Sequence, residues 1–194
     1  MQTKELAIAS INELKEVVEN VCWDNAEQME NEIQRANRIF ITAAGRSLLA
    51  MKFFAMRLMQ LGYTAYLVGE VCTPSIQEND LLIVGSGSGE TQSICTICKK
   101  AKEKGAIVAL FTKKEMSAIS QIADCVIVLN TNPSIMEGAL EPCGWIENDY
   151  KSIRCSGNPF EQSIVIVSDA IICDLMQKTN RGVKQIQKLH ANLE

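Results

Sequence analysis

The residues best suited to bind a ligand form a stretch rich in glycine and hydroxyl side chains, at positions 85–91. Its sequence, Gly-Ser-Gly-Ser-Gly-Glu-Thr, follows the apolar run Leu81–Val84 and precedes a stretch with helical character. Glycine lets backbone approach a ligand closely, and a helix N-terminus offers N–H groups and a positive dipole end to an anion. We predict a phosphate-binding loop in which Ser86, Ser88 and Thr91 donate to the phosphate without a buried lysine.

Two familiar phosphate motifs do not fit this loop. A dinucleotide fingerprint that starts at Gly85 would need glycine where Glu90 stands. A P-loop would need Gly-Lys followed by Ser or Thr, which the stretch lacks. NAD and ATP are therefore poor candidates for the ligand. A helix capped by Ser88, with no ligand, is the remaining alternative.

Two loops together resemble those of the sugar isomerase (SIS) domain. One is Ala44-Gly45-Arg46-Ser47, which follows an apolar run, and the other is the 85–91 stretch. Within that superfamily the chain is similar to the 6-phospho-3-hexuloisomerases over nearly its whole length. The segments that carry this closer likeness are Phe53–Met59, Val68–Glu70 with Thr73-Pro74, Phe160–Gln162 and His190–Glu194.

The resemblance implies an activity and a set of site residues. The activity is isomerisation of 6-phospho-3-hexulose to fructose 6-phosphate through an enediol, as in ribulose monophosphate formaldehyde fixation, with no metal or other cofactor. Matching positions assign proton transfer at carbon to Glu161. They assign proton shuttling or carbonyl polarisation to His190, which in some SIS isomerases comes from a neighbouring subunit. The positions assigned to substrate binding are Gly45, Arg46, Ser47, Ser86, Gly87, Ser88 and Thr91.

The residues alone leave other readings open for the two catalytic candidates. A glutamate such as Glu161 is also favoured near a helix N-terminus by the helix dipole. His190 is the one histidine of the chain, and a histidine near a chain end is commonly a surface residue. Glu70, in a loop that follows a predicted strand, is a second candidate for the base.

Departures from the family pattern keep other functions open. Leu48 stands where the family commonly has glycine, and Pro159 replaces an aliphatic residue. Residues 154–157 read Arg-Cys-Ser-Gly in place of Gln-Pro-Met-Gly. The alternatives are another aldose-ketose phosphosugar isomerase, of the arabinose 5-phosphate type, and a sugar-phosphate-binding regulator without turnover. The lack of a helix-turn-helix segment argues against a transcriptional sensor.

Apolar periodicity predicts the elements that position these loops. Alternating strands and helices indicate an α/β fold, namely a three-layer, doubly wound, five-stranded parallel sheet of flavodoxin-like type with helices on both faces. The ligand should bind beyond the carboxyl ends of the strands. The predicted strands cover residues 38–44, 64–68, 80–84, 107–111 and 125–129, and the predicted helices include 48–61, 91–104, 115–123 and 160–178. Ser47 is placed to cap the first of these helices, and the long connection 130–158 is expected to be functional.

Length and apolar surface bear on domains and assembly. The 194 residues predict a single SIS domain over 1–194. We expect the N-terminal helices within 1–36 and the C-terminal helices within 159–194 to pack on the sheet or on neighbouring subunits. The first helix carries an apolar stripe, and residues 53–59 are unusually apolar. These features predict a homo-oligomer, and family likeness implies a tetramer built as a dimer of dimers.

Composition and charge indicate which kinds of partner and which cell compartment to expect. The net charge of −4 and the lack of a basic stripe argue against nucleic acid. No run of about 18 apolar residues predicts a membrane span, and without a signal-peptide pattern the protein is expected in the cytoplasm. The eight cysteines are then expected to be reduced and mostly buried. Cys95 and Cys98 lack a second pair at zinc spacing, so no metal site is predicted.

Overall fold

A computed structural model describes residues 3–130 and 159–192 of the chain. Its five strands form one sheet in the order β2-β1-β3-β4-β5, and every neighbouring pair is parallel. The five predicted strands are therefore confirmed. Their bounds are β1 (Ile39–Ala43), β2 (Ala65–Leu67), β3 (Leu81–Gly85), β4 (Ile107–Thr112) and β5 (Cys125–Val128).

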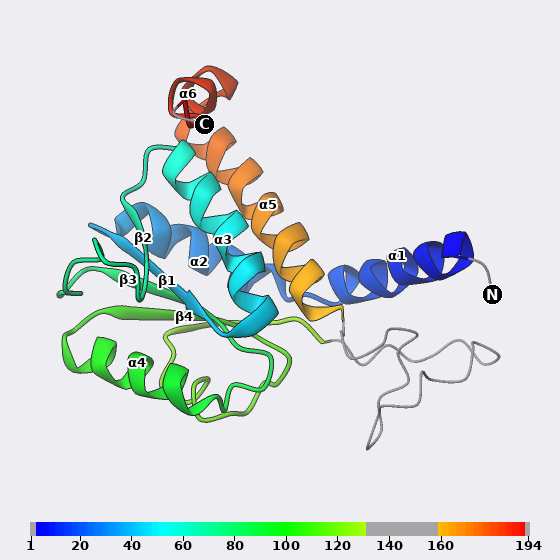
Figure 1. The fold of residues 1–194 in the computed structure, drawn as a ribbon, viewed down its shortest axis with the longest axis horizontal. Helices are drawn as coiled ribbons and strands as arrows, with labels where there is room; N and C mark the ends of the chain where they lie inside the picture. Colours follow the sequence, from blue (N-terminus) through cyan, green and yellow to red (C-terminus); the bar gives the residue numbers. More distant parts are fainter. Residues whose placement is uncertain (1–2, 131–158, 193–194) are drawn as a thin grey trace.

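Helices cover both faces of this sheet (Figure 1). α3 and α5 lie side by side on one face, where α2 packs against β5 and α5, while α4 covers the opposite face. The predicted three-layer, doubly wound arrangement is confirmed. The helix bounds are α1 (Thr3–Glu19), α2 (Trp23–Arg35), α3 (Gly45–Gln60), α4 (Gln92–Glu103), α5 (Phe160–Thr179) and α6 (Val183–Lys188).

The strands divide the hydrophobic core into two parts. In β1, Ile39 and Ile41 pack in the core that contains α3 and α5, whereas Phe40 packs in the core that contains α4. This follows from the period of two in a strand, which turns successive side chains to opposite faces. Burial on both faces explains why these strands read as continuous apolar runs.

The strand order creates a crevice between two loops. β1 leads into α3 on one face of the sheet, and the neighbouring β3 leads into α4 on the other face. The two connections therefore diverge beyond the carboxyl ends of adjacent strands. Such a topological switch point is where open α/β sheets bind their ligands.

Residues 115–123, predicted as a helix, form a series of turns. The Ser117 amide donates to the Ser120 hydroxyl at 2.7 Å, and the Ser120 amide donates to the Ser117 hydroxyl at 3.2 Å. Serine hydroxyls compete in this way with helical hydrogen bonding. The prediction of a helix here is wrong because side chains, rather than carbonyls one turn away, accept these amide hydrogens.

The beginning of α3 also differs from the prediction. The helix begins at Gly45, whose φ of +57° lets the chain turn sharply out of β1, and Ala44 occupies the cap position without a side-chain hydrogen bond. Ser47 therefore lies inside the first turn and does not cap the helix. Ser47 is half-buried.

α1 leaves much of its apolar stripe exposed. Val17 is buried near its C-terminal end, whereas Ile11 is 63% exposed. Figure 1 shows the helix projecting away from the body of the molecule. Packing of this stripe on a neighbouring subunit stays a prediction.

The cysteines divide between core and surface. Cys95, Cys98 and Cys125 are buried, as expected for Cys95 and Cys98, and burial raises the pKa of the Cys98 thiol to about 12. The expectation that most cysteines are buried is wrong within the described part of the chain, where Cys22 and two others are exposed.

None of the helices within 3–130 and 159–192 is both long and apolar enough to cross a membrane.

Candidate functional site

The two predicted ligand loops meet at the carboxyl edge of the sheet. β1 and β3 are paired in register up to Ala43 and Gly85, so the residues that follow these two positions emerge side by side. Gly45 and Arg46 are exposed there, and Ser47 is half-buried. The structure thus brings both halves of the predicted substrate-binding set to the switch point.

Hydroxyl groups shape the 85–91 loop. The Gly89 amide donates to Ser86 Oγ and the Glu90 amide to Ser88 Oγ, both at 3.2 Å. Both hydroxyls act as acceptors, so each keeps its own hydrogen for donation. Ser86 is buried and holds the turn, whereas Ser88 is exposed and Thr91 half-buried at the start of α4.

Backbone N–H groups in the same loop remain open to an anion. In the described part of the chain, nothing accepts a hydrogen bond from the amides of Gly87 and Ser88. These amides lie just ahead of the N-terminus of α4, whose first N–H groups lack intrahelical partners. The combination of open amides, hydroxyl donors and a helix N-terminus suits a phosphate group.

Two glycines of the loop are required for different reasons. Gly89 has a φ of +65°, and a Cβ there would lie only 2.0 Å from Ser117 Oγ. Gly87 does not need a positive φ. A Cβ at Gly87 would instead lie 3.0 Å from Lys113 Cε and 3.3 Å from Phe160 Cδ1, so the loop backbone is in close contact with β4 and α5.

Residues 113–119 hold the loop in place. The Lys113 amide donates to the Gly87 carbonyl at 3.1 Å, and the Ile119 amide donates to the Gly89 carbonyl at 3.1 Å. Glu90 Oε1 accepts from the Ala118 amide at 2.9 Å. Glu90 therefore fixes the loop from outside, which gives a structural reason for the glutamate that breaks the dinucleotide fingerprint.

Glu161 lies in the first turn of α5, directly after the buried Phe160 that touches the loop. Its Oε2 atom is buried, and so is the hydroxyl of Ser163, two residues further along the helix. Neither atom has a hydrogen-bond partner among residues 3–130 and 159–192. Leaving a buried polar atom unpaired costs about 1–3 kcal/mol, and such atoms in native structures usually have a functional reason. The position fits a carboxylate that acts on a bound ligand.

Lys113 lies beside the loop, at a position that the sequence prediction did not name. Its half-buried side chain lies against Gly87 and Phe160. Burial lowers the pKa of Lys113, while the charge of Glu161 partly offsets this and Lys114 lowers the pKa further. The available signal was a lysine directly after a buried parallel strand, which places it at the ligand edge.

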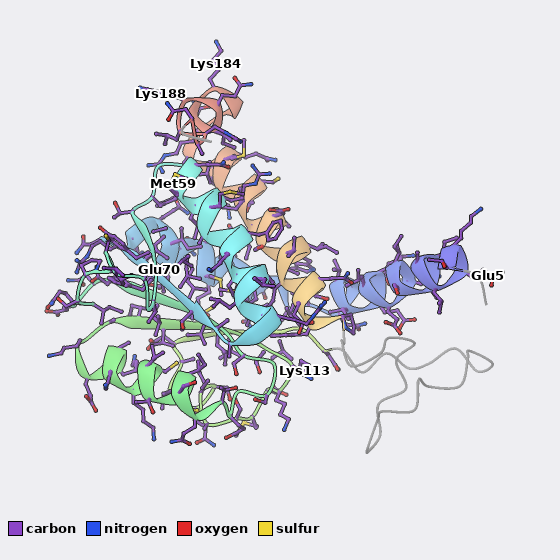
Figure 2. All side chains as sticks on the ribbon, viewed as in Figure 1. Glu5, Met59, Glu70, Lys113, Lys184 and Lys188 are labelled. Carbon is purple, nitrogen blue, oxygen red and sulfur yellow. The ribbon has the colours of Figure 1, made fainter. Side chains whose placement is uncertain are left out.

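His190 lies far from Glu161 of its own chain. α5 has 20 residues and thus a length of about 30 Å, with Glu161 at its beginning. His190 follows α6, beyond the other end, and is exposed. In Figure 2 the α6 residues Lys184 and Lys188 lie at the opposite end of the molecule from Lys113. One subunit therefore does not bring the two predicted catalytic residues together.

The second candidate base, Glu70, is also separate from this cluster. Its side chain is 62% exposed and its carboxylate lies 3.7 Å from Lys52 Nζ of α3. Figure 2 shows it on the β2 side of the molecule, away from Lys113. The structure thus favours Glu161 over Glu70 as the base.

No group of three or more potential metal ligands occurs within the described ranges. Most of the predicted 130–158 loop lies outside these ranges.

Comparison with known proteins places these loops in a family context. The SIS domain family matches residues 32–142, which include both ligand loops. A 3-hexulose-6-phosphate isomerase of Bacillus subtilis (strain 168) is 38% identical over 194 residues and covers all of both chains. A protein of the same name from Methylomonas aminofaciens is 35% identical, over 95% of this chain and 96% of its own.

A solved structure agrees with the fold described above. A hypothetical protein from Methanococcus jannaschii, for which a molecular function of 3-hexulose-6-phosphate isomerase was inferred, superposes with a TM-score of 0.76. It is 32% identical, and the match covers 98% of this chain and 99% of that one. The likeness therefore extends beyond the ligand loops to the terminal helices.

Proposed function

The chain belongs to the SIS domain family, among relatives named 3-hexulose-6-phosphate isomerase, and on this premise we propose that it converts 3-hexulose 6-phosphate to fructose 6-phosphate through an enediol. This reaction is a step of the ribulose monophosphate pathway, and a soluble sugar phosphate as substrate accords with a place in the cytoplasm. The observation that carries the proposal is the buried, unpartnered carboxylate oxygen of Glu161 beside a loop built for phosphate.

The two loops divide the work of binding. The phosphate lies at the N-terminus of α4, where the amides of Gly87 and Ser88 and the hydroxyls of Ser88 and Thr91 can donate to it. The exposed Arg46 and the half-buried Ser47 then lie across the crevice, toward the sugar hydroxyls. Because the chain carries a net charge of −4, these local donors must attract the anionic substrate.

Glu161 performs the proton transfer at carbon. Its carboxylate takes the proton from C2 of the 3-ketose, the C2–H electron pair forms the C2=C3 double bond, and the carbonyl electrons move to O3. A proton then passes from O2 to O3, and Glu161 returns its proton to C3. The product carries its ketone at C2, as fructose 6-phosphate does.

A homo-oligomer supplies the missing imidazole in this proposal. Exposed apolar side chains run along α3, which supports burial of that helix against another copy; they are Leu49, Phe53, Met56 and Met59. A dimer of dimers would place the exposed C-terminal segment of one subunit near the site of the next. His190 of that neighbour then moves the proton between the two substrate oxygens.

A coupled assay tests the assignment. 3-Hexulose-6-phosphate synthase supplies the substrate from formaldehyde and ribulose 5-phosphate, and formation of fructose 6-phosphate is followed for wild type, E161Q and the exposed control E103Q. We expect E161Q to lose about a hundredfold or more in kcat, as for removal of a general base, and E103Q to match wild type. Wild type that binds sugar phosphates but turns none over would favour the regulator, and turnover of arabinose 5-phosphate alone would favour the other isomerase.

Mixing two inactive variants tests the shared site. E161Q and H190A homo-oligomers are each expected to have low activity. Oligomers that contain both variants carry some sites with an intact Glu161 from one subunit and an intact His190 from the other, so activity should reappear on mixing. No recovery in oligomers shown by mass spectrometry to be mixed, or a monomer in light scattering, would overturn the shared site.

A further inference from the structure

We propose that Lys113 is a catalytic residue, whose ammonium group contacts the substrate carbonyl and stabilises the negative charge that develops on its oxygen. No role was assigned to this residue from the sequence. The inference rests on the proposed function, because it places Lys113 beside Glu161 in the same isomerisation.

The backbone fixes where Lys113 lies. It directly follows β4, the neighbour of β3 in the sheet. Its amide donates to the Gly87 carbonyl at 3.1 Å, and the hydroxyl of Thr112 lies 3.4 Å from the same oxygen. Lys113 and the phosphate-binding loop are therefore held together independently of any ligand.

The side chain is aligned by two neighbours. Lys113 Cε lies 3.0 Å from the position that a Cβ on Gly87 would take, and the Phe160 ring lies 3.3 Å from it. The absence of a side chain at Gly87 thus leaves room for the lysine stem between the loop and α5. Phe160 is the first residue of α5 and precedes Glu161, so the end of the Lys113 side chain and the first turn of α5 both lie beside Gly87.

Charge links Lys113 to the proposed base. The charges of Glu161, in α5, and of Lys114, its neighbour in the chain, both act on the pKa of Lys113. Burial is the main reason why its pKa lies below that of an ordinary lysine. A partly desolvated ammonium group interacts more strongly with a nearby negative charge than one in water does.

The reaction keeps that negative charge beside the lysine. Before proton transfer the charge is on the Glu161 carboxylate. When Glu161 takes the C2 proton it becomes neutral, and the charge appears on O3 of the enediolate. Lys113 stays protonated throughout, so it stabilises the transition state without giving up a proton.

Three variants and a substrate analogue test this role. K113M removes the charge, K113R keeps it, and K114M is the matched control on the exposed neighbouring lysine. Sorbitol 6-phosphate has the phosphate and hydroxyls of the substrate but no carbonyl, so its Kd reports binding without the carbonyl contact. Thermal unfolding of each variant shows whether the fold is retained.

We expect kcat of K113M to fall by a factor of about 10²–10³, the range measured for loss of one donor at a developing oxyanion. Its Kd for sorbitol 6-phosphate should stay close to that of wild type. K113R should retain more activity than K113M, and its alkaline loss of activity should move to higher pH. K114M should match wild type in kcat.

Three results would overturn the inference. A Kd for sorbitol 6-phosphate that rises in proportion to the loss of kcat would make Lys113 a phosphate ligand. Unchanged kcat in folded K113M, with active wild type, would show that the lysine has no catalytic role and would leave the proposed function standing. Wild type without turnover of 3-hexulose 6-phosphate would overturn both proposals.

Discussion

Replacing Gly87 by alanine should disturb catalysis while leaving the fold nearly intact. The added Cβ would lie 3.0 Å from Lys113 Cε and 3.3 Å from Phe160 Cδ1. Carbon atoms normally meet at about 3.5–4.0 Å, so the lysine end must move by roughly half an ångström. The φ of Gly87 lies outside the left-handed region, and the backbone can therefore accept a side chain.

The expected magnitude follows from this displacement. A misplacement of about 1 Å at a reacting group costs about a hundredfold in rate, so half of that should reduce kcat about tenfold. The flexible end of a lysine moves more readily than a core side chain, and the free energy of unfolding should fall by no more than about 1 kcal/mol, the low end for overpacking.

The coupled isomerase assay and urea unfolding measure the two quantities side by side. Gly182→Ala is the matched control, because a Cβ at Gly182 would meet no atom within 4 Å. It should change neither quantity. Full activity in Gly87→Ala would refute the view that the loop, Lys113 and the first turn of α5 form one site.

Two further predictions concern stability. Gly89→Ala should lower the free energy of unfolding by at least about 2 kcal/mol. The φ of +65° alone costs an alanine about 1–2 kcal/mol, and the added Cβ would also clash with Ser117. Urea unfolding measures this change, and unchanged stability would contradict the prediction. Glu30 is buried and its carboxylate lies 2.6 Å from Lys178 Nζ. Because burial raises its pKa above 4.5, its contribution to stability is greatest below that pH and declines as pH rises through the raised value. Glu30→Gln should remove this decline, and identical pH profiles of unfolding for the two proteins would refute the reasoning.

The sheet could be predicted from the sequence because burial on both faces leaves a clear pattern. β3 and β4 are continuous apolar runs that end in loops, as is typical of parallel strands buried on both faces. The helix expected at 115–123 failed for a local reason. Ser117 and Ser120 bond each other's amides, and side-chain competition of this kind does not alter the apolar spacing on which the prediction depended.

The site was predictable only where one segment carries all the information. The 85–91 loop contains its own glycines and hydroxyls, so its sequence indicates its chemistry. Lys113 lies beside this loop because β4 pairs with β3, and that contact depends on tertiary structure. The separation of His190 from Glu161 depends on the 20-residue length and direction of α5. A motif match lists both residues without showing that they lie at opposite ends of a helix.

The attachment of the 85–91 loop to residues 113–119 has a consequence for binding energy. Fixing the backbone of one flexible residue requires about 1–2 kcal/mol of conformational entropy. In this chain the hydrogen bonds from Lys113, Ala118 and Ile119 hold the loop before a ligand arrives, so that entropy is lost during folding. A small phosphate ester can then bind with most of its interaction energy intact, which a mobile loop of the same composition would not allow.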